Sequence, residues 1–174
     1  LAAHPQRFTR RRGGVTGRIV NCFLAWAGHR RGGLGHAVVL SNVGIAGMSG
    51  SAVADAAMTG PVLIPSMVNA GYGRAYSAAT VAAAAVIGPI IPPSIPMIIY
   101  GAVTDTSVAR LFMAGAVPGL VIGVYLMICN HLISSRRGYG GAARLPWRDR
   151  WAITLPAIPA LLTPVIILGG MVGG

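Results

Sequence analysis

The stretch Ile87-Gly-Pro-Ile-Ile-Pro-Pro-Ser-Ile-Pro96 interrupts an apolar run that covers residues 75–101. The run is long enough to cross a bilayer, but each proline removes a backbone donor and costs about 3 kcal/mol inside a helix. At about 1.5 Å per residue, a helix over residues 75–87 would reach past the middle of a bilayer core about 30 Å thick. Unwound backbone at that depth persists only where protein or a polar cavity surrounds it. A break of this kind is typical of the binding site of a transporter.

The composition predicts an integral membrane protein. The 174 residues are 54% hydrophobic and only 10% charged, whereas a soluble domain carries about 25% charged residues. The net charge of +11 comes from arginines concentrated in residues 7–31 and 136–150, on either side of apolar segments. Aromatic residues do not interleave with these arginines as they do in single-strand binders. The positive-inside rule therefore accounts for the charge, and the expected partner is a lipid bilayer rather than a nucleic acid.

Residues 37–70 are expected to form a re-entrant hairpin. Their apolar halves, 37–46 and 58–70, are each too short to cross a membrane. Two further spans are expected after this region, at 75–101 and 111–133. If this region also crossed once, the two arginine-rich blocks would lie on opposite sides of the membrane, against the positive-inside rule. A segment that enters and returns keeps both blocks on the cytoplasmic side. The parity of the spans therefore favours the hairpin.

The expected fold class is an all-α membrane protein: a fragment of an ion-transporter-type elevator fold with a re-entrant helical hairpin and a discontinuous transmembrane helix. Ser107 or Thr106 is expected to cap the second span, in which Gly115, Gly119 and Gly123 form a small-residue packing face and Pro118 adds a kink. The expected segments are a disordered or atypical basic head (1–17), an interfacial arm helix (18–36), the hairpin (37–70), the broken helix (75–101), a transmembrane helix (108–133), a basic cytoplasmic loop (134–150) and a truncated transmembrane helix interrupted by prolines (152–174).

The polar residues of the hairpin and the break are the candidate site. Ser49, Gly50 and Ser51 form the expected hairpin tip, and residues 88–94 of the break supply carbonyl groups and the Ser94 hydroxyl. Hard cations such as sodium prefer oxygen ligands of this kind. Asp55 is the one acidic residue inside an apolar region, and it either serves function or caps the returning half-helix through backbone amides. Both roles remain open.

Enzyme motifs are absent from the sequence. There is no H-E-x-x-H or Walker loop, and the four histidines are scattered without metal-ligand spacing. The chain is therefore predicted to be no enzyme, with no catalytic residue, no organic cofactor and no metal beyond sodium.

Three motifs resemble one transporter family. Gly32-Gly-Leu-Gly-His36 leading into Gly47-Met-Ser-Gly-Ser-Ala-Val-Ala-Asp-Ala-Ala57 resembles the first hairpin of the large membrane subunit of tripartite ATP-independent periplasmic (TRAP) transporters. Ile87-Gly-Pro-Ile-Ile-Pro-Pro-Ser-Ile-Pro-Met-Ile-Ile-Tyr-Gly101 is similar to the broken helix of that family, and Leu111-Phe-Met-Ala-Gly-Ala-Val-Pro-Gly119 to the segment that follows it. The resemblance covers residues 17–174. The second hairpin repeat of the family is missing, so a fragment is expected.

The resemblance implies a sodium-coupled permease of the bacterial inner membrane, multi-pass, that imports organic acid anions such as C4-dicarboxylates or sialic acids. Its implied partners are a small four-helix membrane subunit and a periplasmic solute-binding protein. The implied sodium ligands come from Ser49, Gly50 and Ser51 of the tip and from Gly88, Pro92 and Ser94 of the break. Asp55, Ser49 and Pro93 are expected to organise the tip or contact substrate. The alternatives are another hairpin-type sodium/anion symporter and a non-transporting membrane fragment.

Overall fold

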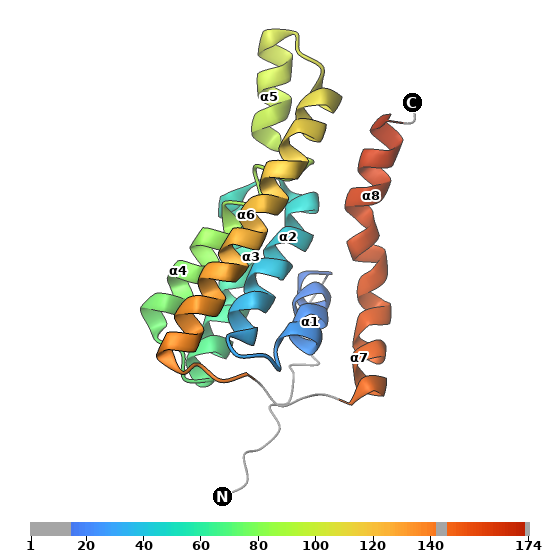
Figure 1. Cartoon of the computed structure of the whole chain (residues 1–174). Helices are drawn as coiled ribbons and strands as arrows, with labels where there is room; N and C mark the ends of the chain where they lie inside the picture. Colours follow the sequence, from blue (N-terminus) through green and yellow to red (C-terminus); the bar gives the residue numbers. More distant parts are fainter. Residues whose placement is uncertain (1–14, 142–145, 173–174) are drawn as a thin grey trace, which may run out of the picture.

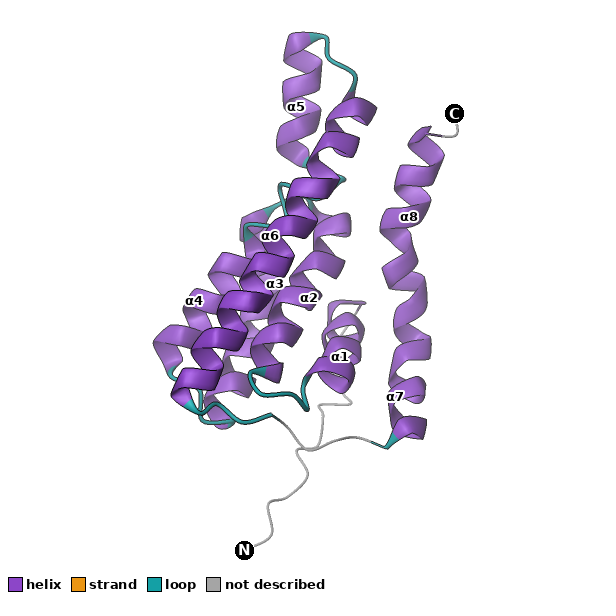
Figure 2. Cartoon of the chain, in the orientation of Figure 1, coloured by secondary structure: helices purple, strands orange, loops and turns teal. Residues whose placement is uncertain are grey.

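The computed structural model describes residues 15–141 and 146–172, and this part of the chain is helical with no strand, as predicted (Figures 1 and 2). The basic head lies largely outside the described residues. The elements in chain order are α1 (Val15–Ala27), α2 (Gly33–Ser49), α3 (Ala52–Asn69), α4 (Arg74–Ala85), α5 (Ile95–Thr104), α6 (Val108–Arg137), α7 (Trp147–Thr154), the 3₁₀ turn η1 (Leu155–Ala157) and α8 (Ile158–Val172).

Helices α2 and α3 form a hairpin with a two-residue tip. Gly50 ends α2 in the left-handed region at φ 60°, a conformation that glycine adopts without steric cost. Ser51 then begins α3 as its N-cap, and its hydroxyl accepts a hydrogen bond from the Ala54 amide. A left-handed glycine followed by a capping serine reverses the chain in very few residues.

The proline-rich stretch separates α4 from α5, as the sequence predicted. Residues 86–94 are non-helical, and Ser94 begins α5 as an N-cap that accepts a hydrogen bond from the Met97 amide. Pro96 falls in the first turn of α5, where a missing amide proton costs nothing. Prolines therefore end one half-helix and start the next.

Helix α6 is the longest element and the one described helix that is both long and apolar enough to cross a membrane. It stays a single helix through Pro118. Its small-residue face is buried: a Cβ added at Gly115 would lie 2.6 Å from the Ile90 carbonyl oxygen, and one at Gly119 would overlap the Ile91 side chain. The predicted side-chain cap is not formed, because Ser107 occupies the N-cap position without a capping hydrogen bond.

The arm region differs from the single helix expected over residues 18–36. Helix α1 ends at Ala27, the chain turns through Gly32 at φ 71°, and α2 starts at Gly33. The apolar face of α1, including the fully buried Ile19 and Val20, packs on the hairpin. Two consecutive glycines favour this turn over a continuous helix.

Helices α7 and α8 form a rod beside the bundle, contacting α1 and α2 (Figure 1). The 3₁₀ turn η1 holds Pro156, whereas Pro159 and Pro164 are accommodated within α8. The loop before α7 is shorter than predicted because α6 continues to Arg137. All three tryptophans, Trp26, Trp147 and Trp151, pack edge to face with ring centroids 5.6–6.1 Å apart, and they attach α7 to α1.

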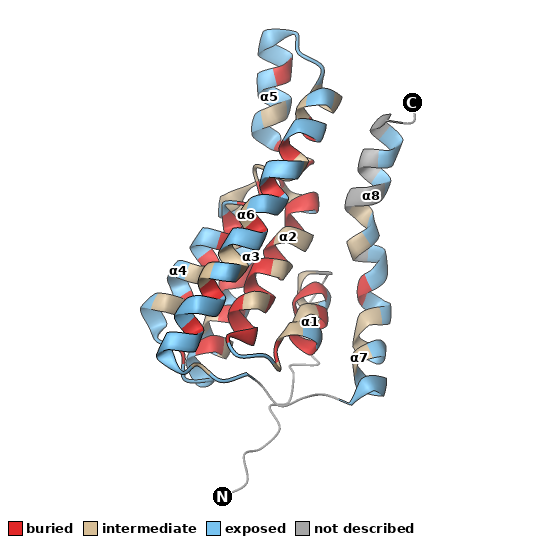
Figure 3. Cartoon of the chain, in the orientation of Figure 1, coloured by how far each residue is buried: buried red, intermediate tan, exposed pale blue. Residues whose placement is uncertain are grey.

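The hairpin is the centre of the bundle. Buried residues concentrate on α1 and α2 and on the sides of α3, α4 and α6 that face α2, while α5 and the adjoining part of α6 extend beyond the hairpin and are largely exposed (Figure 3). Side chains such as Ile99, Val103 and Val117 are more than half exposed there. The hairpin tip consequently lies part-way along α6, next to the break (Figure 1).

Candidate functional site: the hairpin tip against the helix break

The hairpin tip contacts the break directly. A Cβ added at Gly50 would lie 2.6 Å from the carbonyl oxygen of Pro93, 3.1 Å from the amide nitrogen of Ile95 and 3.3 Å from Cα of Ser94. Only a glycine lets the two backbones approach so closely. The candidate residues of the tip and of the break, 37 or more positions apart in sequence, therefore meet in space.

Asp55 also lies between the hairpin tip and the break. It is fully buried in the first turn of α3, and its Oδ1 accepts a hydrogen bond from the Ser49 hydroxyl. Within the described part of the chain its Oδ2 has no hydrogen-bond partner, and a Cβ added at Gly88 would overlap that atom. One carboxylate thus organises the tip through one oxygen and faces the break with the other.

Four helix ends converge at this junction. The carboxyl end of α2, at Gly50, lies against the amino end of α5, and Gly88, just past the carboxyl end of α4, lies against the first turn of α3. Carboxyl ends present carbonyl oxygens that suit a cation, whereas amino ends carry a partial positive charge that suits an anion. The site therefore offers surroundings for ligands of both signs.

The remaining predicted residues make local bonds. The Ser51 hydroxyl caps α3, and the fully buried Ser94 donates to the Pro89 carbonyl oxygen at 2.6 Å while capping α5. Pro92 is buried in the break and Pro93 presents its carbonyl to Gly50. Both serine hydroxyls thus make hydrogen bonds at the starts of the two half-helices, and their expected part as sodium ligands stays a prediction.

Among the hydrogen bonds of the described residues, the Asp55 carboxylate accepts none from the backbone amides of α3. Ser51 is the capping residue, and the Ser49 hydroxyl donates a hydrogen bond to the Asp55 carboxylate. The described hydrogen bonds therefore join the Asp55 carboxylate to Ser49 of the tip and not to the backbone amides of α3.

Asn42 is a buried polar residue that the sequence did not single out. It lies seven residues before Ser49, on the same face of α2. Its side-chain amide donates to the Val38 carbonyl at 2.9 Å, but its Oδ1 is buried without a partner among the described residues. An asparagine within the apolar residues 37–46 was the available signal, because a buried amide oxygen normally has a partner.

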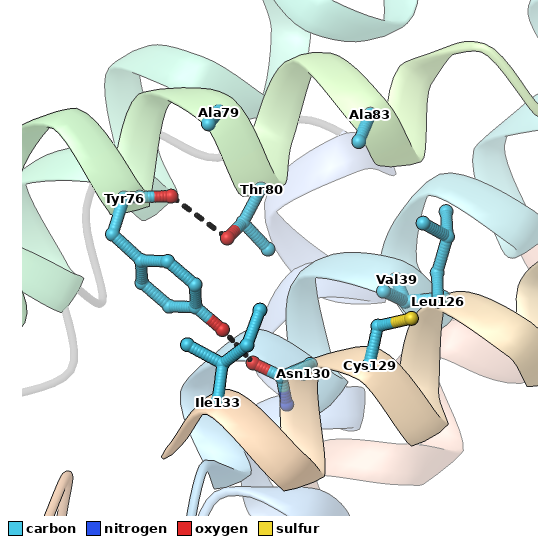
Figure 4. Close-up of a pocket in the computed structure, with 9 residues that line it drawn as sticks. All are labelled: Val39, Tyr76, Ala79, Thr80, Ala83, Leu126, Cys129, Asn130 and Ile133. Carbon is cyan, nitrogen blue, oxygen red and sulfur yellow. Dashed lines mark hydrogen bonds between the residues drawn. The ribbon is translucent and has the colours of Figure 1, made fainter. Parts of the chain in front are cut away.

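A second polar cluster, equally unexpected, joins three helices at the arginine-rich end of the bundle. Asn130 of α6 donates to the Gly32 carbonyl at 2.9 Å. It also accepts from the Tyr76 hydroxyl at 2.8 Å (Figure 4). A Cβ added at Gly35 would overlap Oδ1 of Asn130, so the start of α2 lies directly on this side chain. The bond between Tyr76 and Asn130 borders a cavity of about 230 Å³ between α2, α4 and α6 that Thr80 and Cys129 also line.

Three tyrosines extend the cluster. Tyr72 stacks on Tyr139 at 4.4 Å between ring centroids, Tyr76 packs against both, and the Arg137 guanidinium lies 5.7 Å from the Tyr76 ring. The Tyr72 hydroxyl donates to the Gly140 carbonyl at 3.2 Å. Burial, the largest cause, raises the pKa of Tyr72 to about 12, because the phenolate would lose its hydration there. The cluster fixes the loop after α6 to the base of the hairpin.

Comparison with known proteins places the chain among transport proteins. Residues 9–174 match the family described as "Tripartite ATP-independent periplasmic transporter, DctM component". The sialic acid TRAP transporter large permease protein SiaM of Vibrio cholerae is 42% identical, over 92% of this chain and 38% of the relative. The C4-dicarboxylate TRAP transporter large permease protein DctM of Pseudomonas aeruginosa is 41% identical, over 93% and 38%.

The 2,3-diketo-L-gulonate TRAP transporter large permease protein YiaN of Escherichia coli is 40% identical, again over 93% of this chain and 38% of the relative. The chain spans about two fifths of the length of these relatives. The family match covers the hairpin and the break, whose helix ends build the site. The chain therefore belongs to the DctM component family of tripartite ATP-independent periplasmic transporters.

Proposed function

We propose that this chain forms the first-repeat half of a permease that imports organic acid anions by sodium symport across the bacterial inner membrane, which the complete permease crosses several times. In this proposal it works with a periplasmic solute-binding protein and a small four-helix membrane subunit, and it moves as part of an elevator-type transport domain. The relatives named for sialic acid, C4-dicarboxylate and diketogulonate transport support an organic acid as the cargo.

The observation that carries the proposal is the carboxylate oxygen of Asp55 that no described residue pairs at the junction of tip and break. A buried charge without a partner costs several kcal/mol in a low-dielectric surrounding. A sodium ion held by Oδ2 and by nearby backbone carbonyls of the tip and the break would offset that cost. The sodium is proposed to leave and enter with the cargo, which couples its gradient to transport.

The cargo anion is proposed to approach the amino ends of α3 and α5. Their N-caps, Ser51 and Ser94, place free amides and the positive ends of two helix dipoles near the tip. Because the cation neutralises Asp55, the anion would meet a positive rather than a negative site. Sodium is therefore expected to bind before the anion.

The test is uptake of a labelled organic acid into proteoliposomes that contain the complete permease and its small subunit. Uptake should need an inward sodium gradient and the binding protein, and a potassium gradient of equal size should not replace sodium. Uptake that ignores sodium would overturn the symport proposal. Uptake without the binding protein would favour the alternative of another hairpin-type sodium/anion symporter, and no uptake under any gradient would favour a membrane protein that does not transport.

A further inference from the structure

A second cavity lies apart from the tip, between the end of α1, the first turns of α2 and the second half of α6. Its volume is about 570 Å³, within the range of about 300–1,000 Å³ that small-molecule sites occupy. One part of its wall is apolar and is formed by Leu40, Val124, Met127 and Ile128. We call it the basal groove.

Another part of the wall of the basal groove is polar and basic. Arg30, His36 and His131 line it, and the two imidazole rings stack with centroids 6.0 Å apart. No carboxylate is found among the described residues that line it. An arginine and two imidazoles supply several N–H donors without a negative group to receive them.

The polarity of the groove follows the axis of α6. Val124 and His131 are seven residues apart, or about 10 Å along the helix. His131 lies closer to Arg136 and Arg137 in the last turn of α6, so the basic part of the groove is at the arginine-rich end of the bundle. Trp26, with its amphipathic ring, stands at this end as well. A groove with a basic head at the membrane surface and an apolar body toward the core matches a lipid in orientation and polarity.

We propose that the basal groove binds one anionic phospholipid, with its phosphate on Arg30 and the two histidines and an acyl chain along the apolar wall. Charge complementarity selects this occupant, since a zwitterionic lipid adds a cation beside the same phosphate. A protein segment packed here would need to bring its own carboxylate to match Arg30. The bound lipid would hold α1 against α6 at the arginine-rich end.

Native mass spectrometry of the chain in detergent tests the proposal with phosphatidylglycerol and phosphatidylcholine of identical acyl chains, added in equal amounts. The chain should retain phosphatidylglycerol preferentially, and Arg30→Gln should lower that preference about fivefold, the effect of one basic residue near anionic lipid. Arg110→Gln, at the other end of α6, is the matched control and should leave it unchanged. Val124→Trp should reduce retention of both lipids by filling the apolar wall.

Far-UV circular dichroism checks that each variant keeps its helix content, and His131→Gln replaces Arg30→Gln if that variant does not fold. Equal retention of the two lipids by the unmodified chain would overturn the proposal. So would a preference that survives both head-group substitutions. Retention of a second copy of the chain in place of lipid would overturn it as well and would identify the groove as a protein interface.

Discussion

Oδ2 of Asp55 faces the backbone of Gly88, so the first turn of α3 and the end of α4 meet with no space for a side chain between them. Gly50 repeats this relationship on the other side of the tip, where it lies against Pro93. The hairpin and the broken helix are thus held together by two glycine contacts and one carboxylate. This junction is the structural basis of the proposed sodium site.

Replacement of Gly88 by alanine is expected to separate the junction. The new Cβ would overlap Oδ2 of Asp55 and would lie 3.2 Å from the Ala85 carbonyl oxygen. Overpacking of this kind costs about 1–3 kcal/mol. Thermal unfolding in detergent should show a lower midpoint for Gly88→Ala.

Gly60→Ala is the matched control for that variant. Its added Cβ would make ordinary contacts, at 3.6 Å from Ile64 and 3.9 Å from Val81. Because Gly60 lies inside α3, alanine there should raise stability by up to about 1 kcal/mol. Equal midpoints for the Gly88 and Gly60 variants would contradict the close packing of tip and break.

The Asn130 cluster predicts a loss of stability on truncation. Asn130→Ala would leave the Gly32 carbonyl and the Tyr76 hydroxyl without the hydrogen bonds that Asn130 makes to them. A buried group deprived of its hydrogen bond costs about 1–3 kcal/mol. Asn69→Ala, at the exposed end of α3, should have little effect in the same unfolding measurement. If the two variants unfold alike, the cluster does not anchor the hairpin.

The raised pKa of Tyr72 predicts a loss of stability in alkali. Between about pH 10, where an unperturbed tyrosine titrates, and about pH 12, the folded state binds more protons than the unfolded state. The free energy of unfolding should therefore fall as the pH rises through this window, by about 1.4 kcal/mol for each pH unit.

Tyr72→Phe should remove that dependence. The measurement compares the unfolding midpoints of the two proteins near neutral pH and above about pH 10, and Tyr100→Phe, an exposed tyrosine, serves as the control. A Tyr72→Phe variant that loses stability in alkali as steeply as the parent would assign the effect to other groups.

The sequence predicted the break, the hairpin and the residues of its tip because proline, glycine and serine act locally. Ser51 and Ser94 cap the helices that directly follow them, and Gly50 ends the helix before it. For Asp55 and Gly88, the sequence predicted only that the hairpin tip and the break approach each other, not that these two residues are in contact. Their contact depends on how α3 and α4 are rotated about their axes, which no local pattern determines.

Hydrogen-bond partners that lie far apart in the sequence could not be predicted from it. Asn130 and Gly32 are 98 residues apart, and nothing near either of them identifies the other. The arm was expected to lie in the membrane interface, and its packing on the hairpin was not predicted. In the structure Ile19 and Val20 pack on the hairpin, since a neighbouring protein surface buries apolar side chains as well as lipid does.

The sodium dependence of uptake by a Ser49→Ala permease tests the central proposal most directly. Ser49 holds the Asp55 carboxylate, and loss of a partner that orients a metal ligand costs roughly ten- to a hundredfold in metal affinity. Ser66→Ala is the control, because the Ser66 hydroxyl donates to the Val62 carbonyl of its own helix, well away from the tip. In proteoliposomes, the sodium concentration for half-maximal uptake should rise by that factor for Ser49→Ala and stay unchanged for Ser66→Ala. Identical sodium curves for the parent and for Ser49→Ala would contradict a sodium site at the junction of tip and break.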